Sequence, residues 1–258
     1  LYSVFFLFLA ACVFGPYLVT GHSLIWNTDT ANQHLPLLVK YREYVFSFLR
    51  HLSQGPAEWS WTMGLGSDLF SVFSYYTIGD VFAYLALLFP TSHLVFAYQL
   101  ILLLRLYCVG LAFVYFARHF DFKDGVVLIG SGVYMVNAYL LYAALAQPMF
   151  TTTFILFPLI VVQLERLLQG GSAWPLFGVF VWMLVSNYYL AFVLGLGAII
   201  YLFLRWGLAY WKKIPFWPTI KKLFFASLGA VLLSAGLLLP ELLAVVNSTR
   251  TGSQFANG

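Results

Sequence analysis

The sequence predicts an all-α polytopic membrane protein with about seven transmembrane helices and a long loop after the first of them. Hydrophobic residues make up 62% of the 258 residues and charged residues only 9%, and the mean hydropathy is +0.88. A soluble domain carries about 25% charged residues, so this chain has too few polar side chains to cover a water-facing globule. Its apolar stretches are continuous rather than alternating, which is typical of membrane helices and not of a β-barrel.

The apolar stretches place the spans one by one, because a helix needs about 20 apolar residues to cross the hydrocarbon core. Single spans are predicted at 1–20, 93–117, 126–146, 149–168 and 222–246. The stretch 174–206 is apolar except for an interruption around Asn187. Two short helices that turn at Asn187 are predicted there, and one long helix is the alternative. The whole chain is interpreted as a single transmembrane domain, expected to be the N-terminal part of a longer protein.

Basic residues suggest an orientation, because inner loops carry more Lys and Arg than outer loops. With the loop after the first span outside, eight basic residues fall on the inner side: Arg118, Lys123, Arg166, Arg205, Lys212, Lys213, Lys221 and Lys222. Four fall on the outer side: Lys40, Arg42, Arg50 and Arg250. Residues 21–92 are therefore expected to be extracytoplasmic.

This first loop is too long for a simple connector. Its first half predicts an amphipathic helix, with apolar and charged side chains on opposite faces. The predicted apolar face consists of Leu35, Leu38, Val45, Leu49 and Leu52. Pro36 suits the first turn of this helix, which is expected to lie along the outer membrane surface. The segment Val81–Pro90 is too short to span and is expected to lie in the outer interface.

The polar stretch WNTDTANQHLP (Trp26–Pro36) contains the first candidate for chemistry, Asp29. Thr30–Gln33 matches the capping box, in which a Thr and a Gln accept hydrogen bonds from the free amides at a helix N-terminus. The negative charge of Asp29 would interact favourably with the positive end of that helix dipole. Alternatively, Asp29 is a carboxylate held at the membrane surface as a general base. The two roles are compatible, and the pattern leaves both open.

Other candidates in the loop each have a structural alternative. Asp68 follows Gly64 and Gly66, which permit a close approach to a ligand, but a plain surface turn also explains this pattern. Tyr75 and Tyr76 suit either stacking on a sugar or anchoring at the membrane interface.

Two arginines are candidates for binding a lipid phosphate. Arg105 lies near the middle of its span, where a cation is costly and indicates either function or an acidic partner. Arg250 follows the last span, where it would stabilise a phosphate leaving group or anchor the chain at the interface. The scattered basic residues do not predict nucleic-acid binding, and no nucleotide-binding or metal-binding motif is present.

Five stretches together resemble the YfhO-like bacterial membrane proteins, which are glycosyltransferases of the GT-C type. They are WNTDTANQHLP (Trp26–Pro36), WTMGLGSDLFSVFSYYTIGDVFAYLALLFP (Trp61–Pro90), FPLIVVQLERLL (Phe157–Leu168), SNYYLAF (Ser186–Phe192) and LLPELLAVVNSTRTG (Leu238–Gly252). Their order and spacing make the resemblance specific. The second stretch departs from the family, in which Ser-Pro would follow the paired tyrosines.

The resemblance implies a GT-C-like fold and an enzyme of the bacterial cytoplasmic membrane. It would transfer a hexose or N-acetylhexosamine from an undecaprenyl-phosphate carrier to an acceptor outside the cell, such as lipoteichoic acid. The implied partners are this lipid-linked donor, the envelope polymer and membrane lipids. No cofactor beyond the donor is implied, and a metal requirement stays open.

The resemblance also implies roles for single residues. Asp29 would be the catalytic base, and Arg250, with Arg105 or a first-loop cation such as Arg42, would stabilise the leaving phosphate. The substrate-binding side chains would be Gln33, Asp68, Tyr75, Tyr76, Asn187, Arg105 and Arg250. Two alternatives stay open: a transporter or flippase for a lipid-linked precursor, for which Asn187 in a broken segment is the best argument, and a non-catalytic scaffold.

Overall fold

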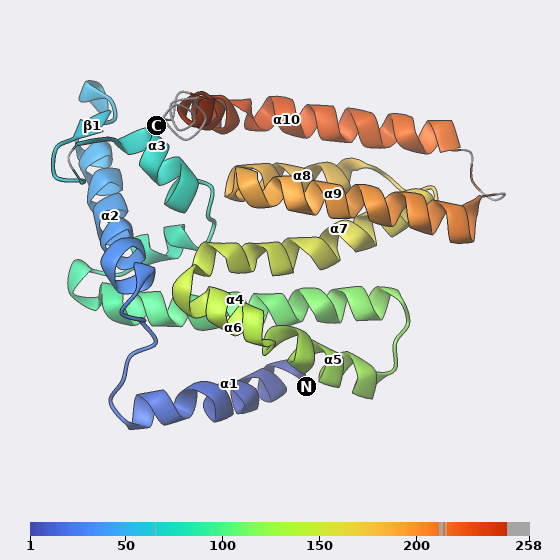
Figure 1. The fold of residues 1–258 in the computed structure, drawn as a ribbon, viewed down its shortest axis with the longest axis horizontal. Coiled ribbons are helices and arrows are strands. Elements are labelled where there is room, and N and C mark those ends of the chain that lie inside the picture. The colour runs from blue at the N-terminus through green and yellow to red at the C-terminus, as the bar shows by residue number, and fades with distance from the viewer. Residues whose placement is uncertain (65, 212–213, 215, 247–258) are drawn as a thin grey trace, which may run out of the picture.

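The computed structural model describes residues 1–64, 66–211, 214 and 216–246, with side chains to residue 243, and is almost entirely helical (Figure 1). Long helices run side by side across the molecule, and shorter helices return the chain between some of them. They are α1 (Tyr2–Val19), α4 (Leu94–His119), α7 (Thr152–Leu168), α9 (Tyr188–Arg205) and α10 (Phe216–Val246). Shorter helices are α5 (Asp124–Met135), α6 (Ala138–Ala146) and α8 (Trp174–Ser186).

Within the described residues, five helices are long and apolar enough to cross a membrane. The pair α5 and α6, bent by 49°, makes a sixth span if it is counted as one. The sequence predicted about seven, and the difference is α8. Its 13 residues extend only about 20 Å at 1.5 Å per residue, which is less than the roughly 30 Å of the hydrocarbon core.

Two asparagines break the apolar stretches in the same way. Asn137 and Asn187 both have extended backbone. Each side-chain oxygen accepts a hydrogen bond from the backbone amide three residues later, that of Leu140 at 2.9 Å and that of Leu190 at 3.1 Å. Each therefore caps the N-terminus of a new helix, α6 or α9. The predicted turn at Asn187 between two helices is confirmed.

The long first loop forms a layer across one end of the helices. Its longest helix, α2 (Leu35–Arg50), runs roughly at right angles to the spans in Figure 1. The other elements of the layer are the π-helical turns η1 (Thr30–His34) and η3 (Ser74–Ile78), the strands β1 (Trp59–Ser60) and β2 (Ser67–Asp68), helix α3 (Leu69–Phe73), and the 3₁₀ turns η2 (Leu52–Gln54), η4 (Ala83–Leu88) and η5 (Thr91–His93). The strands pair antiparallel, with Trp59 opposite Asp68.

The predicted amphipathic helix exists, but its predicted apolar face is partly wrong. Leu38 is buried as expected, whereas Leu49 is 55% exposed and Leu52 62% exposed. The helix instead buries Leu37 and Tyr41 along with Leu38. The reason is the fold of the loop itself, because the ring of Tyr41 packs on that of Phe73 in α3, with centroids 5.3 Å apart.

We call the layer, with the connections that reach it (residues 20–93, 147–151 and 187), the loop end. The opposite connections (residues 119–124, 169–173 and 206–211) form the basic end. The basic end includes η7 (Trp206–Tyr210), and the loop end includes η6 (Pro148–Thr151). Helix ends near the basic end carry six of the eight basic residues predicted to lie inside: Arg118, Lys123, Arg166, Arg205, Lys221 and Lys222. Lys212 and Lys213 lie outside the described residues.

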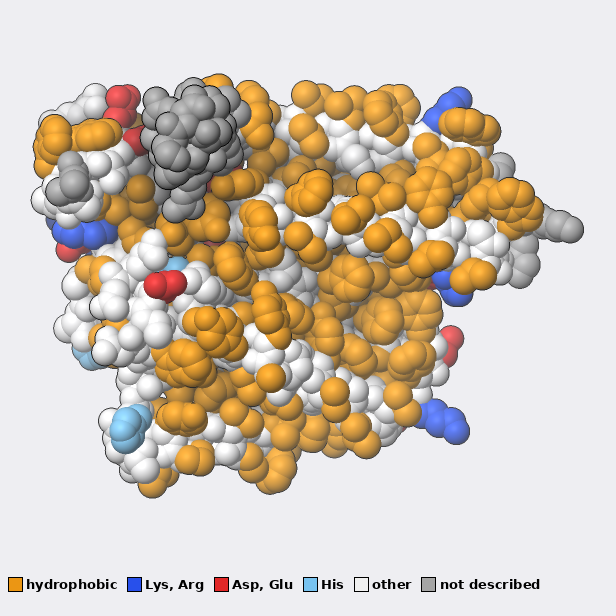
Figure 2. Space-filling view, in the orientation of Figure 1, with side chains coloured by type: hydrophobic (Ala, Val, Ile, Leu, Met, Phe, Trp, Pro, Cys, Tyr) orange, Lys and Arg blue, Asp and Glu red, His pale blue; other side chains and the backbone are white. Residues whose placement is uncertain are grey.

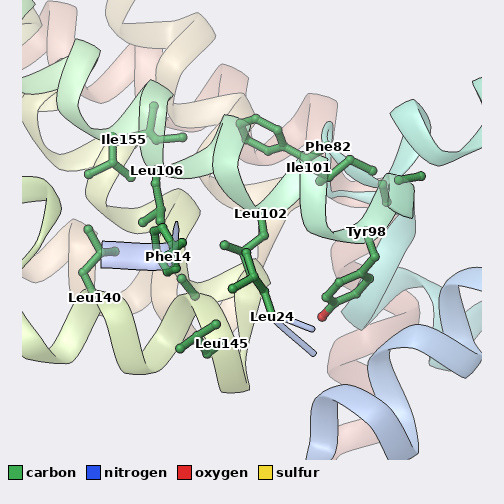
Figure 3. Close-up of a cluster of buried hydrophobic side chains, with 14 of the residues drawn as sticks. Phe14, Leu24, Phe82, Tyr98, Ile101, Leu102, Leu106, Leu140, Leu145 and Ile155 are labelled. Atoms are coloured by element: carbon green, nitrogen blue, oxygen red, sulfur yellow. The ribbon is translucent and has the colours of Figure 1, made fainter. Parts of the chain in front are cut away.

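Helix α4 lies at the centre of the main hydrophobic core. Leu102 and Leu106 of α4 are each 1% exposed and pack with Leu140 of α6 and Ile155 of α7 (Figure 3). Side chains from the chain's first segment, including Phe14, join the same cluster. The loop end contributes Phe82 and Leu24 to it, so the layer is fixed to the spanning helices rather than suspended above them.

The outer surface of the bundle is apolar. Figure 2 shows hydrophobic side chains over the sides of the helices and charged side chains concentrated toward the two ends. Large exposed side chains such as Leu7, Phe192 and Phe225 belong to α1, α9 and α10. An apolar surface of this extent is incompatible with water and fits lipid. The chain is an all-α multi-pass membrane protein.

Candidate functional site

Asp29 lies at the loop end, exposed, at the start of η1. Its carboxylate oxygen Oδ2 accepts a hydrogen bond of 2.6 Å from Nε2 of Gln147. Gln147 occupies the short connection between α6 and η6, 118 residues further along the chain. The carboxylate is therefore held from a second, distant segment, while its other oxygen has no hydrogen bond within the described part of the chain.

His34 completes this arrangement from the buried side. Its Nε2 lies 3.0 Å from Oε1 of Gln147. Burial lowers the pKa of His34, against the opposing effects of Gln147 and the Asp29 charge. A neutral imidazole with its proton on Nε2 donates to the Gln147 oxygen, which leaves the Gln147 amide group to donate to Asp29. The chain His34–Gln147–Asp29 thus orients the carboxylate.

The capping-box interpretation of Thr30–Gln33 is wrong. The hydroxyl of Thr30 is buried and donates to the carbonyl of Leu145, with a longer contact of 3.3 Å to that of Ala146. Both carbonyls belong to the C-terminal turn of α6, where helix carbonyls lack partners within their own helix. No side chain caps η1. The Thr30 hydroxyl, which the local pattern assigns to capping η1, therefore bonds instead to carbonyls at the end of α6.

Gln33 and the paired tyrosines, which the resemblance assigns to substrate binding, lie together. Nε2 of Gln33 donates to the hydroxyl of Tyr76 at 2.6 Å, and the Tyr76 ring centroid lies 5.6 Å from that of His34. Tyr75 packs edge-on against Tyr76 and also against Tyr188 at the start of α9, at 4.7 Å and 5.8 Å. The tyrosines of η3 therefore connect η1 to α9.

We call this group the Asp29 cluster. Its members are Asp29, Gln33, His34, Tyr75, Tyr76, Gln147 and Tyr188. Sequence reasoning missed His34, Gln147 and Tyr188. For His34 the available signal was its place within WNTDTANQHLP; for Gln147 no local signal exists, because its role depends on where the turn after α6 lies.

Asp68 and Asn187 serve as helix caps in the structure. The Asp68 carboxylate accepts from the Phe70 amide at 2.9 Å and from the Ser71 hydroxyl at 2.6 Å, so it starts α3. Asn187 is buried, caps α9 through Oδ1, and has no hydrogen-bond partner for Nδ2 within the described residues. That amide group borders a cavity of about 10 Å³, room for about one water molecule.

Arg105 forms a buried ion pair with Asp80. One guanidinium nitrogen contacts the Asp80 carboxylate, and another donates to the Thr152 hydroxyl at 3.2 Å. The guanidinium also lies 4.5 Å from the ring centroid of Phe82. Arg105 is only 4% exposed, so the expected acid partner is present and this cation does not face a substrate at the surface. Sequence reasoning missed Asp80.

A small cavity connects the ion pair to the Asp29 cluster. It measures about 40 Å³ and is lined by His34 and Tyr76 of the cluster, by Asp80 and Arg105, and by Tyr98. A water molecule needs about 10–15 Å³ of such volume, so the cavity has room for a few waters and none for a sugar. A sugar would have to approach Asp29 from its exposed side.

Of the two remaining predicted cations, the structure describes only Arg42. Arg42 donates to the carbonyl of Phe89 at 2.7 Å and to the Thr91 hydroxyl at 3.2 Å, so it fixes the turn between η4 and η5. Arg250 lies outside the described residues. Within the described chain, no three His, Cys, Asp or Glu residues are grouped as a metal site would require.

One comparison with known proteins identifies a family for this chain. The family model described as "Bacterial membrane protein YfhO" matches residues 3–257. No curated protein and no solved structure matches the chain.

Proposed function

The chain belongs to the YfhO family of bacterial membrane proteins, and from this premise we propose that it is a GT-C type glycosyltransferase. It would transfer a hexose or N-acetylhexosamine from undecaprenyl phosphate to a cell-envelope polymer such as lipoteichoic acid. The reaction would take place at the loop end.

The observation that carries the proposal is the state of Asp29. It is an exposed carboxylate with one oxygen anchored by Gln147 at 2.6 Å and the other without a hydrogen bond within the described residues. A general base must be fixed in position and must reach the proton that it removes. The Gln147 contact supports the first condition, and the exposure of Asp29 supports the second; we expect donor and acceptor to meet beside it.

The proposed reaction needs one proton transfer and one displacement. Asp29 accepts the proton of an acceptor hydroxyl through its free oxygen. The acceptor oxygen forms a bond to the anomeric carbon, while the bond from this carbon to the phosphate oxygen breaks. Undecaprenyl phosphate leaves with the electron pair. Since Arg105 and Arg42 are engaged within the protein, Arg250 stays the proposed partner of the leaving phosphate.

The Asp29 cluster would form the rest of the substrate site. Gln33, Tyr75 and Tyr76 present an amide and aromatic faces beside η1, and aromatic faces pack on the apolar faces of sugar rings in many binding sites. Asp68 and Asn187 would act through the backbone that they cap. The Asp29 end would be extracytoplasmic, because the described basic residues gather mainly at the opposite end.

The transporter alternative has lost its best argument. Polar groups of a transporter are expected near the bilayer midplane on broken helices. Asn187 instead lies where α8 ends and α9 begins, at the loop end, beside Tyr188 and the Asp29 cluster. Transfer therefore stays the proposal, and the bent pair α5 and α6 is the feature on which a transporter would have to rest.

The test is mass spectrometry of envelope polymers from a deletion strain complemented with single variants. Asp29→Asn should abolish one specific sugar modification while membrane levels of the protein stay unchanged. Glu43→Gln is the matched control, because it removes another exposed loop-end carboxylate, which pairs with Lys40 at the surface, and it should retain the modification. Retention of the sugar in Asp29→Asn would exclude the base assignment, and loss of a transported lipid without loss of transfer would favour the transporter.

A further inference from the structure

A groove between α8 and α10 opens at the basic end, far along the bundle from Asp29. Its volume is about 680 Å³, within the range of about 300–1000 Å³ typical of small-molecule sites. Its walls are mainly apolar, from Trp174 and Phe177 of α8 and from Phe225 and Ala226 of α10. Neither the ion pair nor the Asp29 cluster uses any of these side chains.

Small residues on α10 keep the groove open. Ala226 offers a single methyl group, and Gly229 offers none, so a Cβ at Gly229 would already lie 3.3 Å from the ring of Phe177. Trp174 and Phe225 are exposed beside this gap. An unfilled apolar channel of this size on the side of a membrane protein accommodates a hydrocarbon chain.

The mouth of the groove is polar and positively charged. Lys222 lines it and is exposed, with Nζ 3.4 Å from the carbonyl of Gly171. Ser172 is shared with a neighbouring open depression of about 410 Å³ that contains Arg166. Helix α8, of 13 residues, begins at Trp174 beside this mouth, and its N-terminus adds partial positive charge. Apolar walls beneath a cationic mouth match the chemistry of an anionic lipid.

We propose that this groove binds an anionic phospholipid, with an acyl chain between α8 and α10 and the phosphate group beside Lys222. The undecaprenyl-phosphate donor is a poorer fit, because its phosphate must reach Asp29 at the opposite end of the helices. If the basic end is cytoplasmic, it faces the leaflet that is rich in anionic lipids. The proposal does not depend on sugar transfer.

The experiment is native mass spectrometry of the purified full chain with phosphatidylglycerol or phosphatidylcholine. Lys222→Gln removes the proposed headgroup contact, and Lys221→Gln is the matched control, since Lys221 is adjacent and exposed but does not line the groove. We expect Lys222→Gln to weaken phosphatidylglycerol binding about fivefold, the usual effect of one basic residue near an anionic headgroup. The Lys221→Gln variant should stay within about twofold of the parent.

A second variant tests the apolar part. Ala226→Leu narrows the groove without changing its charge and should weaken binding of both phospholipids. The proposal is overturned if Lys222→Gln and Lys221→Gln have equal effects, which indicates general surface attraction, or if neither variant changes binding. It is also overturned if undecaprenyl phosphate displaces phosphatidylglycerol at equal or lower concentration and this displacement is lost in Lys222→Gln.

Discussion

The carboxylate of Asp29 accepts a 2.6 Å hydrogen bond from the side-chain amide of Gln147, which comes from a segment 118 residues away. Gln147 is in turn held by His34, 3.0 Å away, from the same turn as Asp29. The exposed acid is therefore clamped between two segments at the loop end. A carboxylate that served only as a polar surface group would not need these contacts. They favour a role in which the orientation of the Asp29 carboxylate matters.

Replacing Gln147 by Ala should lower the rate of sugar transfer and leave substrate binding nearly unchanged. Without the amide, the Asp29 carboxylate rotates freely, and a misplacement of about 1 Å costs up to about 100-fold in rate. The measurement is kcat and KM for transfer in proteoliposomes. Gln169→Ala is the control, because Gln169 contacts Tyr210 at the basic end. A rise in KM at constant kcat would assign Gln147 to substrate binding instead.

Acidification should weaken the loop end through His34. Burial lowers the pKa of His34 below its ordinary value of about 6.5 in the unfolded chain. Between the two pKa values the unfolded chain binds more protons than the folded one, so stability rises with pH through this window and falls on acidification. Thermal unfolding in detergent from pH 5 to pH 7 should show this slope, and His34→Gln should reduce it. An unchanged slope in that variant would assign the effect to other groups.

The spans could be predicted from the sequence because hydropathy reports length and composition, which are local properties. The break at Asn187 was also predictable, since a polar residue in an apolar run interrupts it. The short length of α8 was predicted too, because two short helices were expected on either side of that break, but hydropathy does not say whether its 13 residues suffice to cross.

The side-chain contacts of the site could not be predicted in the same way. The pattern at Thr30 predicts a cap, but the hydroxyl binds the free carbonyls at the end of α6, which only the tertiary fold brings near. Arg105 predicts an acidic partner, yet the sequence does not say that the turn between η3 and η4 brings Asp80 to it. The position of Asp29 in the loop after the first span followed from hydropathy, whereas its contact with Gln147 depends on the turn after α6.

Breaking the buried ion pair should destabilise the protein strongly. Asp80→Asn leaves the Arg105 guanidinium buried without a compensating charge, which costs about 3–5 kcal/mol. Thermal unfolding in detergent measures the loss. Asp124→Asn is the control, because Asp124 pairs with Arg118 at the surface, with side chains 75% and 56% exposed, and such pairs contribute about 0–1 kcal/mol. Equal losses of stability in the two variants would show that the Asp80–Arg105 pair contributes no more to stability than a surface ion pair.

Among the described glycines, Gly79 is the one at which an added Cβ would come closest to another part of the chain. A Cβ built there would lie 1.4 Å from the backbone carbonyl oxygen of Val185, in the last turn of α8. Since a backbone atom cannot rotate away, Gly79→Ala should force the chain between η3 and Asp80 off α8, lowering the thermal unfolding temperature and strongly reducing transfer. Gly178→Ala is the matched control within α8, because a Cβ there meets nothing within 4 Å; it should stabilise the helix by about 0.5–1 kcal/mol. A Gly79→Ala variant as stable and active as the parent would mean that this contact between η3 and α8 does not hold the site together.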